Sequence, residues 1–277
     1  MLTRVTLSNG VVVYQSRLLN SVGVVHAFST RIGGVSPVPF ESLNLGNPPG
    51  AVHDTVENVR RNFGRMLSAL KLPDVPVASV RQVHGCDVAL LQDQGDGEYS
   101  ESVAAEIRDR FQGQIAADAI ISDVSSAVLA VRIADCAPIL LAAENGRLVA
   151  AIHAGWRGVV AQVGARTIAE INAMGYQSSQ IMAAIGPAIG MEHFEVGPEV
   201  AEQFQSLGLN SAVHTIGYTR PHIDLADAIK RQLRQCGVTL IDGGGLCTFI
   251  NAADFFSHRR DHGITGRMAA IIRPVIP

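Results

Sequence analysis

The sequence predicts a fold of the α+β or α/β class, in which mixed β-sheets are flanked by helices. Between residues 118 and 154 the chain holds four short apolar runs rich in Val, Ile, Leu and Ala, which is typical of buried strands. From residue 158 onward, stretches with a helical apolar period are interleaved with further apolar runs. The 277 residues contain no internal repeat, low-complexity tract or linker, so we expect one domain spanning 1–277.

The first part of the chain is predicted to combine short strands, long loops and one helix. Asp54 is the expected N-cap of that helix, because Glu57 follows three residues later. Long ordered loops are often functional, which draws attention to the Gly-rich stretch. In chain order, the predicted elements are short strands within 3–28, a Gly-rich loop at 29–50, a helix over 53–70, a strand over 75–85, and a polar surface excursion with a short helix at 92–114.

The second part of the chain is dominated by strands and then by helices. Gly175 is placed to end the first of these helices. The periodicity leaves open whether the strands form one sheet or two. The predicted strands are 118–123, 127–136, 137–144, 146–154, 181–190 and 262–274, and the predicted helices are 158–175, 197–208 and 222–237.

Composition excludes several classes of function. The net charge is −3 and the pI is near 6.3, with no long basic run, so we expect no nucleic-acid partner. No window of 18 uninterrupted apolar residues exists and the N-terminus lacks the pattern of a signal peptide, so we expect no membrane partner. The four cysteines form no CxxC pair, which favours reduced thiols and a cytoplasmic location. We expect a monomer or a weak dimer.

A hairpin brings a cysteine and a histidine together. Asn145-Gly146 is a strong signal for a two-residue turn, and it pairs Glu144 with Arg147. In that register Pro138 faces His153, and Cys136 lies two residues away on the same face of the sheet. The two Cα atoms should then be about 7–8 Å apart. Either residue alone is ordinary core, but the pair at one end of two rigid strands is a candidate for metal binding or catalysis.

A zinc site built on this pair needs a third protein ligand. The candidates are His26, His84, His258 and His262. We favour His84, because it ends a predicted strand with Gly85 behind it, as His153 does with Gly155 nearby. Cys86 follows the turn and should be displaced from the site. The stretch from His258 to His262 resembles an inverted zincin motif, but Asp replaces Glu, so we discount it.

The segments HAFSTRIGGVS, RQVHG, ADAIIS, VRIADCAPILL, AAIHAGWRG and FFSHRRD resemble the YfiH family, also called the laccase-domain family, from about residue 24 to 272. Its bacterial members are labelled polyphenol oxidase or multicopper laccase, peptidoglycan editing factor, or purine nucleoside phosphorylase. The resemblance implies a fold similar to the catalytic domain of cytotoxic necrotising factor. It also implies a zinc site with His84, Cys136 and His153 as ligands.

The resemblance further implies phosphorolysis of adenosine, inosine, guanosine and methylthioadenosine, together with deamination of adenosine. The expected partners are therefore a small-molecule nucleoside and phosphate. Glycines 155 and 158 turn the strand into a helix whose first N–H groups, with Arg157 beside them, can hold an anion. The candidate phosphate- or ribose-binding residues are Arg31, Arg157 and Arg260. The candidate catalytic residues are Asp135, as an acid or base or as a partner of a histidine, with Cys136 and His153.

Copper is not expected, although the family carries a laccase label. A multicopper oxidase needs about ten histidines, grouped in HxH pairs, and a cysteine. This chain has nine histidines and no HxH pair. Two alternatives to the phosphorylase remain open: a hydrolase with Cys136 as nucleophile and His153 as base, acting on an amide of a peptidoglycan precursor, and a zinc protein without catalytic activity.

Overall fold

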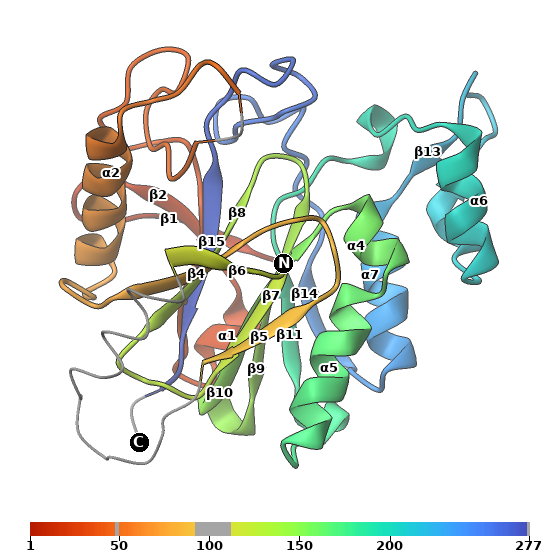
Figure 1. The fold of residues 1–277 in the computed structure, drawn as a ribbon, viewed down its shortest axis with the longest axis horizontal. Coiled ribbons are helices and arrows are strands. Elements are labelled where there is room, and N and C mark those ends of the chain that lie inside the picture. The colour runs from red at the N-terminus through yellow and green to blue at the C-terminus, as the bar shows by residue number, and fades with distance from the viewer. Residues whose placement is uncertain (48–49, 92–111, 276–277) are drawn as a thin grey trace.

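The computed structural model describes residues 1–47, 50–91 and 112–275, and two β-sheets form its centre (Figure 1). The first sheet, sheet 1, mixes antiparallel and parallel pairs. Its strand order is β1 (Thr3–Thr6), β2 (Val12–Gln15), β3 (Val25–Ser29), β15 (Met268–Arg273), β8 (Val128–Ile133), β4 (Val77–Arg81) and β6 (Gln112–Ala116).

The second sheet, sheet 2, is also mixed, and its two central strands are buried along their whole length. Its strand order is β14 (Leu240–Gly243), β11 (Met182–Ile185), β9 (Ala137–Ala143), β10 (Leu148–Ala154), β7 (Ala119–Ser122) and β5 (Val88–Leu91). A small separate pair joins β12 (Val213–His214) to β13 (His222–Ile223). The predicted class, mixed sheets flanked by helices, is confirmed.

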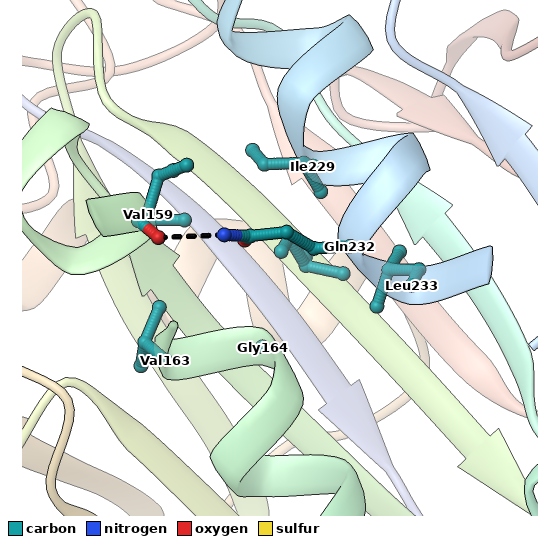
Figure 2. A pocket seen from close by; sticks show the side chains of 8 residues that line it. Val159, Val163, Gly164, Ile229, Gln232 and Leu233 are labelled. Carbon is teal, nitrogen blue, oxygen red and sulfur yellow. Dashed lines mark hydrogen bonds between the residues drawn. The ribbon is translucent and has the colours of Figure 1, made fainter. Parts of the chain in front are cut away.

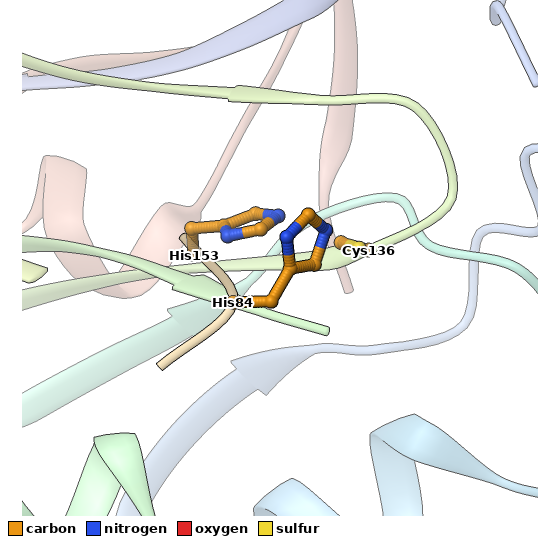
Figure 3. A group of neighbouring side chains, drawn as sticks. All are labelled: His84, Cys136 and His153. Atoms are coloured by element: carbon orange, nitrogen blue, oxygen red, sulfur yellow. The ribbon is translucent and has the colours of Figure 1, made fainter. Parts of the chain in front are cut away.

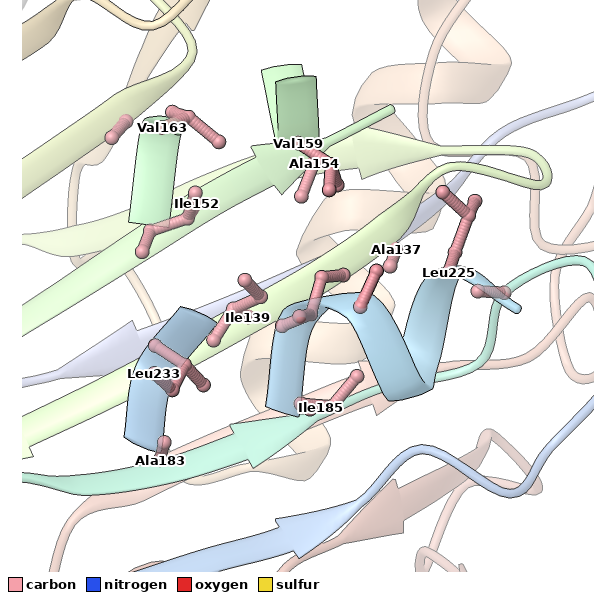
Figure 4. Packing of buried hydrophobic residues seen from close by; sticks show 14 of the residues in the cluster. Ala137, Ile139, Ile152, Ala154, Val159, Val163, Ala183, Ile185, Leu225 and Leu233 are labelled. Carbon is pink, nitrogen blue, oxygen red and sulfur yellow. The ribbon is translucent and has the colours of Figure 1, made fainter. Parts of the chain in front are cut away.

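Side-chain alternation divides sheet 2 between two apolar cores. On β9, Leu140 and Ala142 face sheet 1, where they pack with residues such as Leu129 and Ile272. Ile139 and Leu141 face the other way, toward the helices (Figure 4). Successive side chains of a strand point to opposite faces of the sheet, and both faces of sheet 2 are covered here. The strands β9 and β10 are therefore apolar throughout.

Helices cover the outer faces of both sheets. The α2 helix (Val56–Ala69) packs on sheet 1 through residues such as Met66 and Leu67. The helices α4 (Trp156–Val160), α5 (Val163–Ala173) and α7 (Leu225–Gln235) cover sheet 2. The other α-helices of the described residues are α1 (Arg17–Asn20) and α6 (Pro198–Ser206). Among the described helices, none has the length and apolar character needed to cross a membrane.

Several predicted boundaries are wrong. The N-cap of α2 is Thr55, whose side chain accepts from the Asn58 amide; Asp54 instead accepts hydrogen bonds from Ser36 and Asn44. The predicted helix 158–175 is two helices, because Gln162 lies in the left-handed region with φ 61°. The predicted strand 75–85 stops at Arg81, and strand β14 was not predicted. Gly175, with φ +96°, follows the end of α5 as expected, and the excursion predicted at 92–114 lies mostly outside the described residues.

Three connections cross from sheet 1 to sheet 2 at the same end of the molecule. The strands β4, β6 and β8 run parallel to one another, so their carboxyl ends lie at one edge of sheet 1. Each then enters sheet 2, as β5, β7 and β9, through residues 82–87, 117–118 and 134–136. The carboxyl ends of parallel strands are a common place for binding sites, and here the three crossings converge there.

Candidate metal centre

The hairpin between β9 and β10 has the predicted register. Asn145 and Gly146 both have positive φ, 55° and 89°, as a two-residue hairpin turn requires. His153 pairs with Pro138, and Cys136 directly precedes β9. The turn therefore positions the cysteine and the histidine at the end of sheet 2 where the crossings meet.

His84 lies in the crossing between β4 and β5, and one carboxylate fixes its backbone. The Asp118 carboxylate accepts hydrogen bonds from the amides of Val83, His84 and Gly85, at 3.2, 3.0 and 2.6 Å. His84 has φ +61°, which is uncommon for a residue other than glycine. Three amide donors to one carboxylate hold this turn in place.

His84, Cys136 and His153 come together as one cluster (Figure 3). One ligand atom from each lies within 4.8 Å of the others. The two imidazole rings meet edge to face, with centroids 4.9 Å apart. His153 is buried, Cys136 is half-buried and His84 is exposed, so the cluster opens toward solvent on the His84 side.

Gly155, the residue after β10, leaves room for the cluster. A Cβ atom at this position would lie 2.9 Å from Cys136 Sγ and 3.2 Å from His84 Cδ2. Both distances are shorter than ordinary contacts, so any side chain here would displace one of the two residues. The sequence predicts only that this glycine lets the chain turn. In the structure, its missing side chain also allows the Cys136 sulfur and the His84 ring to lie close to the backbone.

The charges of the cluster favour a thiolate beside an imidazolium. Burial raises the pKa of the Cys136 thiol, but the charges and hydrogen bonds of His153 and His84 outweigh burial and lower this pKa to about 6. Burial lowers the pKa of His153, but the Cys136 thiolate and the Asp118 carboxylate raise it to about 9. Burial also raises the pKa of Asp118, and its hydrogen bonds with His153 and with backbone amides bring it below the usual value.

The donor set fits a zinc ion. Zinc takes imidazole nitrogen and thiolate sulfur at about 2.0–2.3 Å, and catalytic sites commonly supply three protein ligands and leave one position open. Two imidazoles and one easily ionised thiol within 4.8 Å, with one exposed side, meet these requirements. Within the described ranges this is the one such group of His, Cys, Asp and Glu residues. The assignment of the three residues as ligands remains a prediction.

The carboxylate that orients His153 is Asp118, which the sequence analysis did not identify. His153 Nδ1 donates to Asp118 Oδ1 at 2.8 Å, and both residues are buried. A metal-ligating histidine commonly donates its second ring nitrogen to a carboxylate in this way, which fixes the tautomer and leaves Nε2 as the ligand. The available signal was weak: Asp118 stands directly before the apolar strand 119–122.

Asp135 has a different position from the one expected for a partner of a histidine. Its carboxylate accepts from the Thr248 hydroxyl at 2.6 Å and from the Arg259 amide at 2.7 Å. Its carbonyl accepts from the Ile189 amide. Asp135, with φ +88°, therefore ties three loops to the crossing that carries Cys136. An acid or base role for it remains a prediction.

The three arginines predicted to bind phosphate differ in how many of their side-chain N–H donors the protein already uses. All five N–H donors of Arg260 are used, on Asp261 and on the carbonyls of residues 248, 249 and 255. Arg31 donates to two carbonyls and lies 4.6 Å over the Phe256 ring. Arg157 is exposed and lies over Trp156. The geometry gives Arg260 a structural role, and its predicted contact with phosphate has no geometric support.

The rejected and alternative ligands lie apart from the cluster. His26 uses both ring nitrogens, one with the Val24 carbonyl and one accepting from the Ser16 amide. Cys86, two residues after His84, accepts a hydrogen bond from Arg166 and is not a member of the group. His258 and His262 are likewise outside it.

An apolar space between the helices and sheet 2 is not a ligand site. It has an empty volume of about 200 Å³ but no room for a water-sized molecule. Gln232 of α7 donates to the Val159 carbonyl across it, among Val163, Ile229 and Leu233 (Figure 2). The metal cluster thus remains the candidate site.

A family model described as multi-copper polyphenol oxidoreductase laccase matches residues 25–274. The chain belongs to this family. The resemblance to the YfiH family is thereby confirmed. A protein named purine nucleoside phosphorylase YfiH from Escherichia coli is 39% identical over 251 residues, covering 90% of this chain and 93% of the relative. One named purine nucleoside phosphorylase from Deinococcus radiodurans is 37% identical over 252 residues, covering 91% and 90%.

Solved structures of YfiH-family proteins have the same fold. YlmD from Geobacillus stearothermophilus superposes with a TM-score of 0.86 at 28% identity and covers 100% of both chains. A Bacillus licheniformis protein described as hypothetical protein YfiH gives 0.83 at 27% identity, covering 98% of this chain and 99% of the other. The mixed sheets and their flanking helices are therefore the family architecture.

Proposed function

We propose that this chain is a zinc-dependent purine nucleoside phosphorylase that also deaminates adenosine. The proposed substrates are adenosine, inosine, guanosine and methylthioadenosine, with inorganic phosphate as the second substrate. One observation carries the proposal: the His84–Cys136–His153 cluster, with Asp118 behind it, in a chain whose relatives at 37–39% identity are named purine nucleoside phosphorylases.

The proposed metal is zinc, held by His84, Cys136 and His153. When bound, it supplies a Lewis acid with one position open to water or substrate. The chain has nine histidines and no HxH pair, too few for the trinuclear and blue sites of a multicopper oxidase. The copper in the family description is therefore not part of the proposal for this chain.

In phosphorolysis, a phosphate oxygen bonds to C1′ of the ribose while the bond from C1′ to the purine breaks. The purine leaves with the electron pair and takes up a proton, and ribose 1-phosphate remains. The residues of the chain orient the site for this: Asp118 holds His153 in one tautomer and holds the turn that carries His84. The exposed side of the cluster, at His84, admits the nucleoside, whereas the buried side at His153 excludes water.

Product analysis tests this proposal. Purified, zinc-loaded protein is incubated with adenosine, with and without inorganic phosphate. We expect adenine and ribose 1-phosphate only when phosphate is present, and inosine with ammonia in both cases. Neither product under either condition would overturn the proposal.

A second candidate, the cysteine hydrolase, is favoured by one specific observation. Without a metal, Cys136 with a pKa of about 6, His153 with a pKa of about 9 and the Asp118 carboxylate form a thiolate–imidazolium–carboxylate series. Such a nucleophile could attack an amide of a peptidoglycan precursor. A thiolate that ligates zinc is a poor nucleophile, so zinc should inhibit this activity and support the phosphorylase.

The remaining expectations stay predictions. The chain is proposed to act in the cytoplasm as a monomer or weak dimer, without a nucleic-acid or membrane partner. A zinc protein without catalytic activity would bind the metal and fail in both activity assays.

A further inference from the structure

An arginine not singled out by the sequence analysis lies beside the metal cluster. Arg267 directly precedes β15, whose first residue, Met268, pairs with Ile133 at the end of β8. The next residues after β8 form the crossing that carries Asp135 and Cys136. The Arg267 guanidinium interacts electrostatically with both of these residues. Arg267 therefore supplies a positive charge to the side of the cluster formed by sheet 1.

The guanidinium of Arg267 is only partly used by the protein. Nη1 donates to the Gly266 carbonyl at 3.0 Å and approaches the Thr265 carbonyl at 3.4 Å. In the described ranges, Nε and Nη2 donate to no protein group. No fully buried side-chain nitrogen or oxygen there lacks a partner, so these two nitrogens reach solvent. Asp135, the carboxylate that interacts electrostatically with Arg267, uses its two oxygens for Thr248 and Arg259.

The backbone of Arg267 is fixed although two of its side-chain nitrogens are free. Its amide donates to Asn44 Oδ1 at 2.8 Å, and its carbonyl accepts from the Leu45 amide at 2.9 Å. Asn44 is itself buried and hydrogen-bonded to Asp54. A half-buried cation on a rigid base, with two adjacent donors uncommitted, matches the planar fork by which arginine binds phosphate.

The other arginines of this region each differ from Arg267, and Arg157 is exposed and lies over Trp156. Arg260 has no free donor, and Arg259 gives both terminal nitrogens to the Glu195 carbonyl. Arg31 is stacked on Phe256 and bonded to two carbonyls. Arg267 combines free donors, a fixed backbone and proximity to Cys136.

We propose that Arg267 binds the phosphoryl oxygens of the inorganic phosphate beside the metal cluster. This deepens the proposed function and rests on it. The phosphate oxygens would accept from Nε and Nη2, and the guanidinium would hold the anion next to the site where the nucleoside binds. This proposal adds Arg267 to the phosphate-binding candidates Arg31, Arg157 and Arg260, whose contacts with phosphate remain predictions.

The test compares Arg267→Gln and Arg267→Lys with Arg273→Gln. Arg273 is the matched control, because it stands at the other end of the same strand and its side chain donates to the Ser125 carbonyl. For zinc-loaded protein we measure the KM for phosphate and for inosine, and the binding of inorganic phosphate by calorimetry. Zinc content and the circular dichroism spectrum establish that each variant is folded and loaded.

We expect Arg267→Gln to raise the KM and the Kd for phosphate by about 30-fold, as for one lost charged hydrogen-bond pair. The KM for inosine should change by less than about threefold, Arg267→Lys should recover part of the loss because it keeps the charge, and Arg273→Gln should behave as wild type. Unchanged phosphate affinity in a folded Arg267→Gln, or equal rises in both KM values, would overturn the assignment. Wild-type protein that neither binds nor uses phosphate would instead overturn the proposed function.

Discussion

Asp118 joins the parts of the candidate metal centre at the level of single residues. One carboxylate orients the His153 ring and accepts the amides of the turn at His84. It is fully buried, and its hydrogen bonds hold its pKa below the usual value despite that burial. Two of the three candidate ligands therefore depend on one side chain that does not itself belong to the ligand set.

Substitution of Asp118 by Asn should weaken metal binding more than it weakens folding. The amide would place an NH₂ group against backbone N–H donors and would remove the charge that favours His153 as a donor. We expect zinc affinity to fall by about 10–100-fold. Competition with a chelating dye measures this, and Asp87→Asn, which changes an exposed carboxylate in the crossing that carries His84, is the control. Equal affinities in the two variants would show that Asp118 does not support a ligand.

Zinc uptake should release a number of protons that depends on pH. In the metal-free protein, Cys136 is a thiolate above about pH 6 and His153 is protonated below about pH 9. The metal requires a thiolate and a neutral imidazole, so between these values about one proton should leave, from His153. Affinity should then rise by about tenfold per pH unit across this window. Calorimetry at pH 7.5 in buffers of different ionisation enthalpy counts the protons; a count of zero there would contradict the imidazolium.

How well each residue of the site could be predicted depends on whether its contacts are local or distant in the sequence. Cys136 and His153 come from a local rule, because a two-residue turn at Asn145-Gly146 fixes every pair along the hairpin. Asp118 could not be found this way. Its contact with His153 needs the pairing of β10 with β7, between chain segments that no short turn connects. Arg267 was missed for the same reason: its neighbour is a crossing more than a hundred residues earlier.

At the scale of elements, the junction between β10 and α4 has no room for a side chain at Gly155. Gly155→Ala should reduce zinc affinity while leaving the fold intact, because φ −74° and ψ 171° suit alanine but the Cβ would lie 2.9 Å from Cys136 Sγ. Gly85→Ala is the matched control, since its Cβ would have ordinary contacts at 3.6 Å. Zinc content after dialysis measures both. Full retention of zinc by Gly155→Ala would mean that the cluster has more room than its contacts indicate.

Substitutions in the layer of helices on sheet 2 should change the stability of the protein through packing. Gly164 lies in α5 beside the apolar space, and a Cβ there would meet Leu233 at an ordinary 3.7 Å. We expect Gly164→Ala to stabilise the protein by up to about 1 kcal/mol, and Leu233→Ala to destabilise it by about 2–5 kcal/mol. Denaturant unfolding measures both changes. A Gly164→Ala variant less stable than wild type would contradict the expectation that a methyl group fits against Leu233.

Elements were predicted well where a continuous apolar run or a helical apolar period decided them. The buried strands β9 and β10 and the helix α7 follow from apolar pattern. The break between α4 and α5 did not, because Gln162 adopts a left-handed conformation that its residue type does not favour. The apolar period continues across the break, so the sequence resembles one long helix.

At the scale of the whole molecule, the site exists because the chain crosses from sheet 1 to sheet 2 three times at the same edge. His84, Asp118 and Cys136 each lie in or beside a different crossing from sheet 1 to sheet 2. A periodic pattern in the sequence reports which faces are buried, but not which sheet each strand joins. The class of the fold could therefore be predicted, whereas the division into two sheets, and with it the convergence of the crossings, could not.

The central claim is that this convergence builds a site for one zinc ion, and elemental analysis tests it most directly. Wild type, His84→Ala and Cys86→Ala are purified without added metal and analysed for zinc and copper per chain. The two substituted residues are two positions apart, so Cys86→Ala controls for disturbance of the same turn. We expect about one zinc in wild type and in Cys86→Ala, and almost none in His84→Ala. Several copper atoms per chain, or zinc lost from Cys86→Ala and kept by His84→Ala, would contradict the account.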